Sequence, residues 1–290
     1  MKTKIRYKNK VKLIEKDDNK YIYKIKKSDK KDLYQYLLNI KFINFLPLKE
    51  TNNQYEIYNY IEDEYITNDE KAIDIINVLI SLHVKTTTYQ EISIEEIKTL
   101  YENTKKNIKY LRNYYLDLQD YIETKVYMSP AEQLLMNNIS KFYKALNYAE
   151  EKIEQWYIEK EQQKQERTVQ LHNNLSLDHI IKKDIPYIIS WDKSKRGNPI
   201  YDFLYFYKKE YNNLEMNYLF NLYQDKYSFY PEEKMLFESL ISIPEKISFQ
   251  KTNYINTINA KSIIDYVDKT NEFLLKYNKK NEHTNHEEFK

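Results

Sequence analysis

The sequence predicts an α+β protein with two lobes. A small antiparallel-sheet lobe is expected over residues 1–62 and a large, mainly helical lobe over residues 63–277. The first sixty residues mostly alternate apolar and polar positions with the period of two that strands need, whereas the pattern after Asp63 has the spacing of three and four that helices need. A chain of 290 residues is long enough to bury a sizeable core in such an arrangement.

Two hairpins and a helix are expected in the N-terminal lobe. VKLIEK (11–16) and YIYKIKK (21–27), separated by the polar turn DDNK, alternate as paired strands do and are rich in β-branched and aromatic residues. A helix follows from about Asp29 to Ile40. INFLPLKE (43–50) and YEIYNYIED (55–63), separated by TNNQ, predict the second hairpin.

A long antiparallel helical hairpin is expected in the helical lobe. One helix covers residues 69–86, and a second covers about 93–125 with a stripe of apolar residues at alternating spacings of four and three. Ser129, Pro130 and Glu132 then form a capping box with proline at the first helical position, which opens a helix to about Gln163. Two long helices joined by a short capped turn predict the hairpin.

The remaining segments are a β-like stretch and several helices. Residues 168–192 contain two short apolar pieces around a KKDIP turn, and helical patterns follow over residues 200–211, 216–227, 232–243 and 260–277. The tail, residues 278–290, has no apolar side chain before Phe289, which predicts disorder.

Composition excludes several classes of function. The net charge is +2, from 46 basic and 44 acidic residues, so we expect no nucleic-acid partner and no membrane partner. The absence of cysteine excludes disulfides, thiolate metal sites and cysteine nucleophiles. No signal peptide or membrane span is apparent, which predicts a cytoplasmic protein. Tyrosine, with 31 residues, must supply much of the core, and the joint excess of Lys, Asn, Ile and Tyr is typical of an AT-rich genome.

Gly197 is the only glycine of the chain. Loops that cradle phosphates need glycines for positive φ angles and for close approach of backbone amides, so a Walker A loop and a dinucleotide fingerprint are both excluded. The one stretch that is crowded with chemically capable side chains is LHNNLSLDH, residues 171–179.

The order of these elements and several short motifs resemble the aminoglycoside phosphotransferase and choline kinase branch of the protein-kinase-like fold. The motifs are YIYKIKK, YEIYNYIED, INVLISLHVKT (76–86), LHNNLSLDH and IISWDKSKRGNPIYDF (188–203), and MLFESLISIPEKI (235–247) is similar to a segment of the CotS-type spore-coat proteins. The resemblance covers roughly residues 10–275. It implies a two-lobed kinase-like fold with ATP and Mg²⁺ as cofactors.

The resemblance also implies roles for particular residues. Lys24 would bind nucleotide phosphates, with Lys26 as its neighbour on the same face, and YEIYNYIED would lead to the adenine-binding hinge. His172 falls at the frame histidine of the catalytic loop, Asn174 at the aspartate that accepts the substrate proton, and His179 at a magnesium-binding asparagine.

The second metal motif is altered too. Ser190 falls at the principal metal aspartate, Trp191 at the aromatic residue and Asp192 at the acid that follows. Asp202 matches a carboxylate that braces the catalytic loop, and the helix after YIYKIKK has no glutamate to pair with Lys24. His83, which ends the Leu-x-x-Leu-His motif, is expected to be structural.

These substitutions weaken the chemistry of phosphoryl transfer. An asparagine amide cannot accept a proton at neutral pH, and loss of a general base costs about 10²–10⁴ in rate. A serine hydroxyl and an imidazole are poor ligands for Mg²⁺. We therefore expect a catalytically impaired pseudokinase that acts as a binding or scaffold module, with a protein or small-molecule partner that the sequence does not identify, in the cytoplasm or in the spore coat.

Several alternatives stay open at this stage. In an active small-molecule kinase, Asp192 would replace Ser190 as metal ligand if IISWD is a strand, because residues two apart share a face, and Asp178 would replace His179. His172, Asp178, His179 and Asp192 could together bind zinc or manganese. The loop side chains could instead only satisfy buried backbone groups. A purely helical structural protein without a pocket is the remaining alternative.

Overall fold

A computed structural model describes residues 4–8, 11–16, 19–27 and 29–287. The chain forms two compact units, each assembled from separate segments of sequence. The first contains Met1–Thr88, Thr168–Phe206 and Asp225–Tyr227, and the second contains Tyr89–Arg167, Tyr207–Gln224 and Ser228–Lys290. The first unit thus combines the expected N-terminal lobe with residues 63–88 and 168–206.

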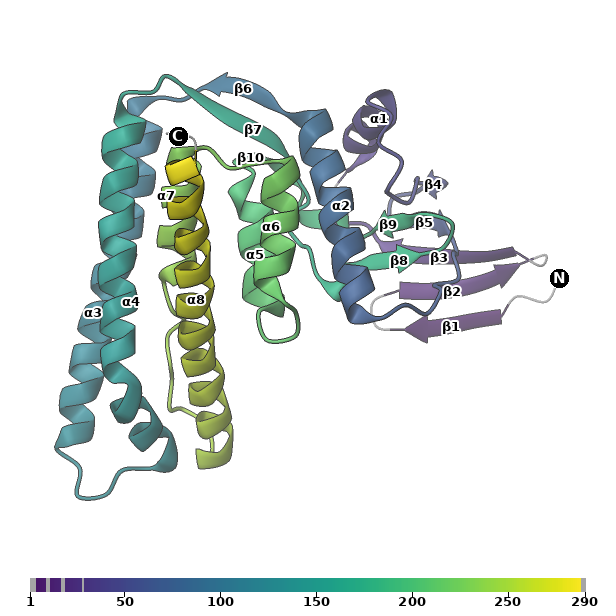
Figure 1. The fold of residues 1–290 in the computed structure, drawn as a ribbon. Helices are drawn as coiled ribbons and strands as arrows, with labels where there is room; N and C mark the ends of the chain where they lie inside the picture. Colours follow the sequence, from purple (N-terminus) through teal and green to yellow (C-terminus); the bar gives the residue numbers. More distant parts are fainter. Residues whose placement is uncertain (1–3, 9–10, 17–18, 28, 288–290) are drawn as a thin grey trace. The chain divides into compact units, whose positions relative to one another are not determined.

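An antiparallel sheet of five strands forms the N-terminal part of the first unit (Figure 1). Its strands, in spatial order, are β1 (Lys4–Lys8), β2 (Val11–Lys16), β3 (Asn19–Ile25), β5 (Tyr55–Asn59) and β4 (Glu50–Thr51). The predicted hairpin of β2 and β3 is confirmed, with Val11 opposite Lys24 and Lys16 opposite Asn19. The sequence did not indicate β1.

The second predicted hairpin is shorter than expected. Only the two residues of β4 pair with β5, and most of INFLPLKE is irregular. Pro47 lacks a backbone N–H, which disfavours a continuous ladder there. This segment contributes to the core instead: Phe45 is 2% exposed, and its backbone forms an isolated β-bridge with Ile188.

The other elements of the first unit surround the LHNNLSLDH loop. They are α1 (Lys31–Asn39), α2 (Asn68–Thr86), the short 3₁₀ turns η1 (Leu177–His179) and η2 (Trp191–Lys193), and strands β8 (Ile180–Lys182), β9 (Pro186–Ile188) and β10 (Lys195–Gly197). α2 packs against β8, β9 and η1. Strand β7 (Gln165–Leu171) lies between β10 and β6 (Thr88–Glu91) in a three-stranded sheet, and α5 (Ile200–Glu210) follows β10.

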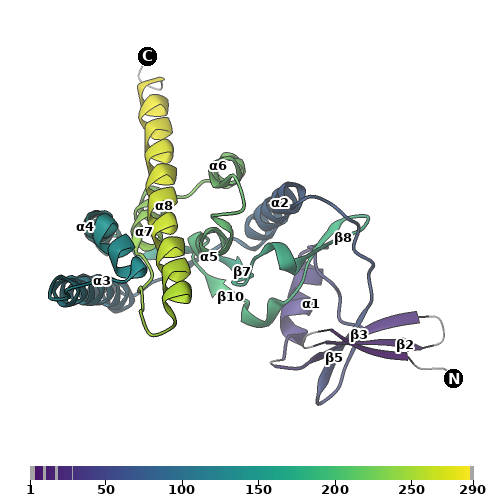
Figure 2. The same cartoon turned by 90° about the horizontal axis from the view of Figure 1, so that it is seen from below.

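The second unit is built from long helices. They are α3 (Ile94–Glu123), α4 (Pro130–Glu161), α6 (Met216–Lys226), α7 (Pro231–Ser242) and α8 (Asn253–Glu287). Figure 1 shows α3 and α4 side by side, and Figure 2 shows the same pair end-on. The predicted helical hairpin is confirmed, and the capping box of Ser129 and Glu132 is formed. A second capping box, of Ser93 and Glu96, opens α3.

The apolar stripes of the hairpin are buried as their spacing predicts. Fully or nearly fully buried side chains along it are Ile108, Leu111, Tyr115, Ile122, Leu135, Phe142, Leu146, Ala149, Ile153 and Trp156. Tyrosine does contribute large core side chains, and its hydroxyl finds a partner: Tyr115 donates to the Glu245 carbonyl at 2.7 Å.

The end of the chain differs from the expected disorder. Helix α8 continues to Glu287, whereas the sequence predicted a disordered tail from residue 278. The segment contains no proline or glycine, so its backbone can continue a helix that already exists. Residues 288–290 lie outside the described residues. Within the described part of the chain, no helix is both long and apolar enough to cross a bilayer.

Candidate functional site

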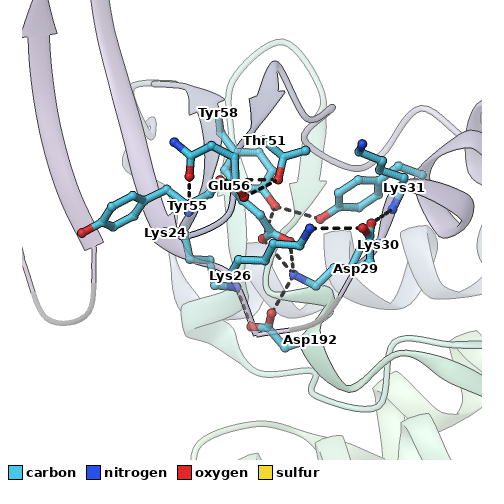
Figure 3. Close-up of polar contacts among 12 residues, drawn as sticks. Lys24, Lys26, Asp29, Lys30, Lys31, Thr51, Tyr55, Glu56, Tyr58 and Asp192 are labelled. Atoms are coloured by element: carbon cyan, nitrogen blue, oxygen red, sulfur yellow. Dashed lines mark hydrogen bonds and ion pairs between the residues drawn. The ribbon is translucent and has the colours of Figure 1, made fainter.

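The candidate site is a chain of alternating charges in the first unit, centred on Asp192 (Figure 3). Lys24 lies on β3 directly opposite Glu56 on β5, so their side chains project from the same face of the sheet. The Lys24 ammonium lies 2.5 Å from Asp192 Oδ2. Lys24 and Asp192, 168 residues apart in the sequence, thus meet as an ion pair.

Lys30, immediately before α1, lies between the two acids. Its Nζ is 2.7 Å from Asp192 Oδ1, and 2.9 and 2.8 Å from the two carboxylate oxygens of Glu56. The Lys30 residue is 5% exposed and Glu56 is 1% exposed. Helix α1 contains no glutamate that could pair with Lys24. The carboxylate that pairs with Lys24 belongs to Asp192.

Two buried tyrosines complete this chain of contacts. Tyr58 donates to Glu56 Oε2 at 2.9 Å, and the hydroxyls of Tyr34 and Tyr58 lie 3.0 Å apart. Burial raises the pKa of both tyrosines, so they are neutral donors over the physiological range. Two lysines and two acids balance in charge, which allows the cluster to be buried.

Both central charges are kept ionised by their partners. Burial alone would raise the pKa of Asp192, but hydrogen bonds to Lys24 and Lys30 outweigh it and lower that pKa. Burial would likewise lower the pKa of Lys30, but its contacts with Asp192 and Glu56 outweigh burial and raise it. At neutral pH, an ammonium group therefore contacts each carboxylate oxygen of Asp192, with Lys24 at Oδ2 and Lys30 at Oδ1.

Lys26 does not take part in this cluster. Strand β3 ends at Ile25, and the Lys26 ammonium pairs with exposed Asp29 at 3.1 Å. Its backbone N–H donates to the Gln54 carbonyl at 2.9 Å, which continues the pairing of Ile25 with Tyr55, so the expected place of Lys26 beside Lys24 on the same face stays a prediction.

The segment that carries Ser190 and Asp192 is not a strand. β9 ends at Ile188, Ser190 has left-handed backbone angles (φ 70°, ψ 50°), and residues 191–193 form a 3₁₀ turn. The condition under which Ser190 and Asp192 would share a strand face is therefore not met. Trp191 explains the turn, because its buried indole donates to the Ile188 carbonyl at 2.9 Å.

Asp202 braces the start of the LHNNLSLDH loop. Its carboxylate accepts the backbone N–H of His172 at 2.8 Å and that of Asn173 at 2.5 Å, and His83 Nε2 lies 3.2 Å away. Asp202 and His83 are fully buried. Asn173 has a positive φ of 58°, which asparagine tolerates better than most residues. Asp202 and His83 thus have the structural roles that the sequence predicted.

His172 is buried as a neutral side chain. Its Nε2 lies 3.0 Å from the Ile189 carbonyl oxygen, so this nitrogen carries the proton. The His172 and Trp191 rings pack edge to face, with their centroids 4.8 Å apart. Burial lowers the pKa of His172 to about 4. A fully buried neutral imidazole holds the loop against β9 and does not exchange protons with a substrate.

The remaining loop residues do not form a metal cluster with His172 and Asp192. His179 Nδ1 donates to the Asn174 carbonyl at 2.6 Å, and Asp178 is exposed on η1. Among the residues that the structure describes, no three His, Asp or Glu side chains gather as ligands for one ion. The zinc or manganese alternative therefore has no support in the geometry.

Magnesium does not fit the site in this form. Mg²⁺ needs free carboxylate oxygens at about 2.0–2.1 Å. Both oxygens of Asp192 contact ammonium groups, Ser190 offers a hydroxyl, and the Nδ1 of His179 is bound to a carbonyl. The site would have to lose a lysine contact before Asp192 could hold a divalent ion.

An apolar cavity lies beside Lys24. Its volume is about 160 Å³, close to that of cavities of about 150 Å³ that accept one benzene-sized ring. It is lined by Val11, Ile22, Leu46, Ile181, Ile188 and Ile189, together with Lys24, Tyr34, Tyr58, Ser190 and Trp191. The cavity has room for one small flat ring, with Lys24 at its polar side.

Sequence reasoning missed Lys30 and Glu56. Their contact depends on the register that places Glu56 opposite Lys24 and on the path of the chain before α1. The available signal was weak: an acidic residue between Tyr55 and Ile57, near the start of the strand YEIYN.

Comparison with solved structures identifies the fold. An aminoglycoside phosphotransferase from Alicyclobacillus acidocaldarius superposes with a TM-score of 0.71 at 10% identity, over 97% of this chain and 92% of the other. The chain has the aminoglycoside phosphotransferase fold. This confirms the predicted kinase-like fold class.

Other structures with this fold are less similar. A spectinomycin phosphotransferase bound to AMP has a TM-score of 0.53 at 12% identity, over 95% of this chain and 88% of the other. A choline kinase from Streptococcus pneumoniae has a TM-score of 0.46 at 14% identity, over 94% of each chain. No family model matches the sequence, and no curated protein matches it significantly. The aminoglycoside phosphotransferase fold is thus established by structure alone.

Proposed function

We propose that the protein is a kinase-like binding module that has lost metal-assisted phosphoryl transfer. The observation that carries this proposal is the state of Asp192. Of residues 179, 190 and 192, which the resemblance assigns to the metal site, Asp192 is the only acid, and Lys24 and Lys30 contact both of its oxygens. A carboxylate neutralised in this way is a structural ion, not a metal ligand.

The catalytic loop supports the same conclusion. Asn174 stands at the position of the general base, and an amide cannot accept a substrate proton at neutral pH. His172 is neutral and buried, so it cannot take over this role. Loss of the base alone costs about 10²–10⁴ in rate, and loss of the metal adds to it.

The ligand that fits best is an adenine nucleotide. The apolar cavity next to Lys24 suits a base, and the ammonium of Lys24 suits a phosphate. A phosphotransferase of the same fold was solved with AMP bound. In this proposal the nucleotide stabilises the module and regulates its binding to a partner, without being consumed.

An active small-molecule kinase is the second candidate. The observation that favours it is that Asp192 lies beside Lys24, at the edge of the same cavity. Here the phosphates of ATP would take Lys24 away from Asp192 and free one carboxylate oxygen for Mg²⁺. The γ-phosphate would then pass to a substrate hydroxyl.

Two measurements on the purified protein separate the candidates. Melting temperature is recorded with ATP or ADP, each with Mg²⁺ or with EDTA; a ligand at 100 times its dissociation constant adds about 2.7 kcal/mol of stability. ADP release is then followed with aminoglycosides and choline as hydroxyl acceptors. The binding module predicts a melting shift without ADP release. ADP release that is lost in Asp192→Ala would establish the kinase instead, and the absence of any nucleotide shift would refute nucleotide binding.

We also propose, from the resemblance of MLFESLISIPEKI to CotS-type proteins, that the module acts as a scaffold of the spore coat. The resemblance is the only support for this location. Immunodetection in coat extracts of purified spores tests it, with the cytoplasm of vegetative cells as the comparison. Signal only in the cytoplasmic fraction would refute the coat location and leave the cytoplasmic one.

A further inference from the structure

The ammonium of Lys30 has the surroundings of a bound cation. Three carboxylate oxygens from two acids lie within 2.9 Å of its Nζ: Asp192 Oδ1 at 2.7 Å and Glu56 Oε1 and Oε2 at 2.9 and 2.8 Å. Figure 3 shows Asp192 and Glu56 on either side of Lys30. Convergence of two carboxylates on one point is the arrangement by which proteins hold divalent ions.

The charge of the cluster leaves no need for a metal ion. Lys24 and Lys30 supply two positive charges, and Asp192 and Glu56 supply two negative charges. A divalent ion between the two acids would have to expel the Lys30 ammonium, which is 5% exposed. A displaced charge without a partner in a buried position is costly, so the lysine resists replacement.

The two lysines differ in how firmly their ammonium groups are held. Among the described residues, Lys24 forms an ion pair with Asp192 alone, and its side chain is 20% exposed beside the cavity. Lys30 is held by two acids, and its side chain is 4% exposed. When Lys24 turns to a ligand phosphate, Asp192 keeps the ammonium of Lys30. The cluster can therefore offer one cation to a ligand while Asp192 and Glu56 both keep their contacts with Lys30.

We propose that the Lys30 ammonium is a built-in replacement for a divalent cation between Asp192 and Glu56, so that the protein binds an adenine nucleotide without a metal ion. The nucleotide part rests on the proposed function, whereas the replacement of the metal by Lys30 does not. The inference predicts that removing the lysine creates a metal site where the wild-type protein has none.

The first arm of the test uses the wild-type protein. The dissociation constant for ATP is measured by calorimetry with EDTA and with Mn²⁺ or Mg²⁺. Metal independence predicts values that agree within about threefold. Binding of ATP that requires the metal would overturn the inference, as would a wild-type melting temperature that rises with Mn²⁺ alone.

The second arm uses Lys30→Met and Lys30→Gln with Mn²⁺ alone as the probe. Removing the ammonium leaves Glu56 and Asp192 Oδ1 converging on the vacated position, while Lys24 still contacts Asp192 Oδ2. Mn²⁺ should therefore raise the melting temperature of these variants by about 5 °C or more. Lys26→Met is the matched control, because Lys26 pairs only with exposed Asp29, and Mn²⁺ should leave its melting temperature unchanged. Folded Lys30 variants that do not respond to Mn²⁺ would overturn the inference.

Two variants are used so that the response to Mn²⁺ can be measured even if one of them folds poorly. Lys30→Gln keeps a hydrogen-bond donor for the buried Glu56, and Mn²⁺ added during refolding should rescue Lys30→Met if that variant is otherwise unstable. The readout needs neither nucleotide nor activity. A failure of nucleotide binding therefore appears as loss of the ATP shift with the Mn²⁺ response intact, whereas a failure of the metal inference appears as loss of the Mn²⁺ response.

Discussion

At the scale of single residues, the start of the LHNNLSLDH loop is held by contacts of two buried side chains. Asp202 holds two backbone N–H groups, and His172 holds the Ile189 carbonyl. Neither of these contacts involves Asn174. Asp202 and His172 should therefore contribute to stability, and that contribution can be tested.

The pH dependence of stability should contain a contribution from His172. Its pKa is about 4 in the folded protein and about 6.5 when unfolded, so protonation favours the unfolded state. This stability is fully present above the unfolded value and is lost as the pH falls from 6.5 towards 4, by up to about 3 kcal/mol. The variant His172→Gln keeps a donor for the Ile189 carbonyl but does not titrate in this range. Its free energy of unfolding should therefore fall less than that of the wild-type protein when the pH is lowered from 6.5 to 4. Urea unfolding of both proteins at several pH values checks this, and parallel curves would contradict it.

Asp202→Asn should destabilise the protein by about 3 kcal/mol, because a buried carboxylate that accepts two backbone N–H groups is replaced by an amide with one acceptor. Asp178→Asn is the matched control, since Asp178 is exposed in the same loop and its replacement should change stability by less than about 0.5 kcal/mol. Chemical denaturation measures both. Equal effects of the two substitutions would contradict the bracing role of Asp202.

At the scale of elements, hydrophobic period and capping residues were sufficient to predict the long helices. The stripe from Leu135 to Trp156 and the capping box at Ser129 are local signals, and both are present in the structure. Short strands that depend on a distant partner were not predictable. β10 exists because residues 195–197 pair with β7, and residues 191–193 form a turn because Trp191 is buried beside His172.

The same limit applies to the candidate site. The resemblance indicated Lys24 and Asp192, and they do meet. Lys30 and Glu56 could not be added, because a buried ion pair is set by strand register and by the path of the chain, and neither is encoded in a local pattern. A lysine before a helix and an acid in a strand each have many possible partners when only the sequence is known.

Gly197 gives a test of element packing on β10. Its φ is not positive, so its role is to provide space: an added Cβ would lie 2.9 Å from Leu171 Cδ1 on the neighbouring strand. Gly197→Ala should therefore cost about 1 kcal/mol by overpacking. Combined with Leu171→Val, which removes that methyl group, the substitution should cost less than the sum of the two single changes. Denaturant unfolding measures these changes in the free energy of unfolding. If the two changes simply add, the new Cβ at position 197 does not press on Leu171, and the predicted overpacking is contradicted.

At the scale of the whole molecule, the first compact unit cannot be cut out as one piece of chain. Lys24, Lys30 and Glu56 come from residues 1–88, whereas Asp192 and the LHNNLSLDH loop come from residues 168–206. The N-terminal segment alone therefore lacks the acid that balances two lysines and the β8–β9 hairpin that lines the cavity.

A fragment of residues 1–88 should accordingly fail to fold cooperatively, although it contains the complete five-stranded sheet and α1. Without Asp192, the buried Lys30 and Glu56 retain each other, but Lys24 has no acidic partner, and the apolar residues facing Ile181 and Ile188 are exposed to water. Thermal unfolding followed by near-UV circular dichroism measures this, with the full chain as the reference. Adding a peptide of residues 168–206 should restore a cooperative transition if the two segments form one unit. A cooperative transition of the 1–88 fragment alone, or no response to the peptide, would show that the sheet is stable without the site that it carries.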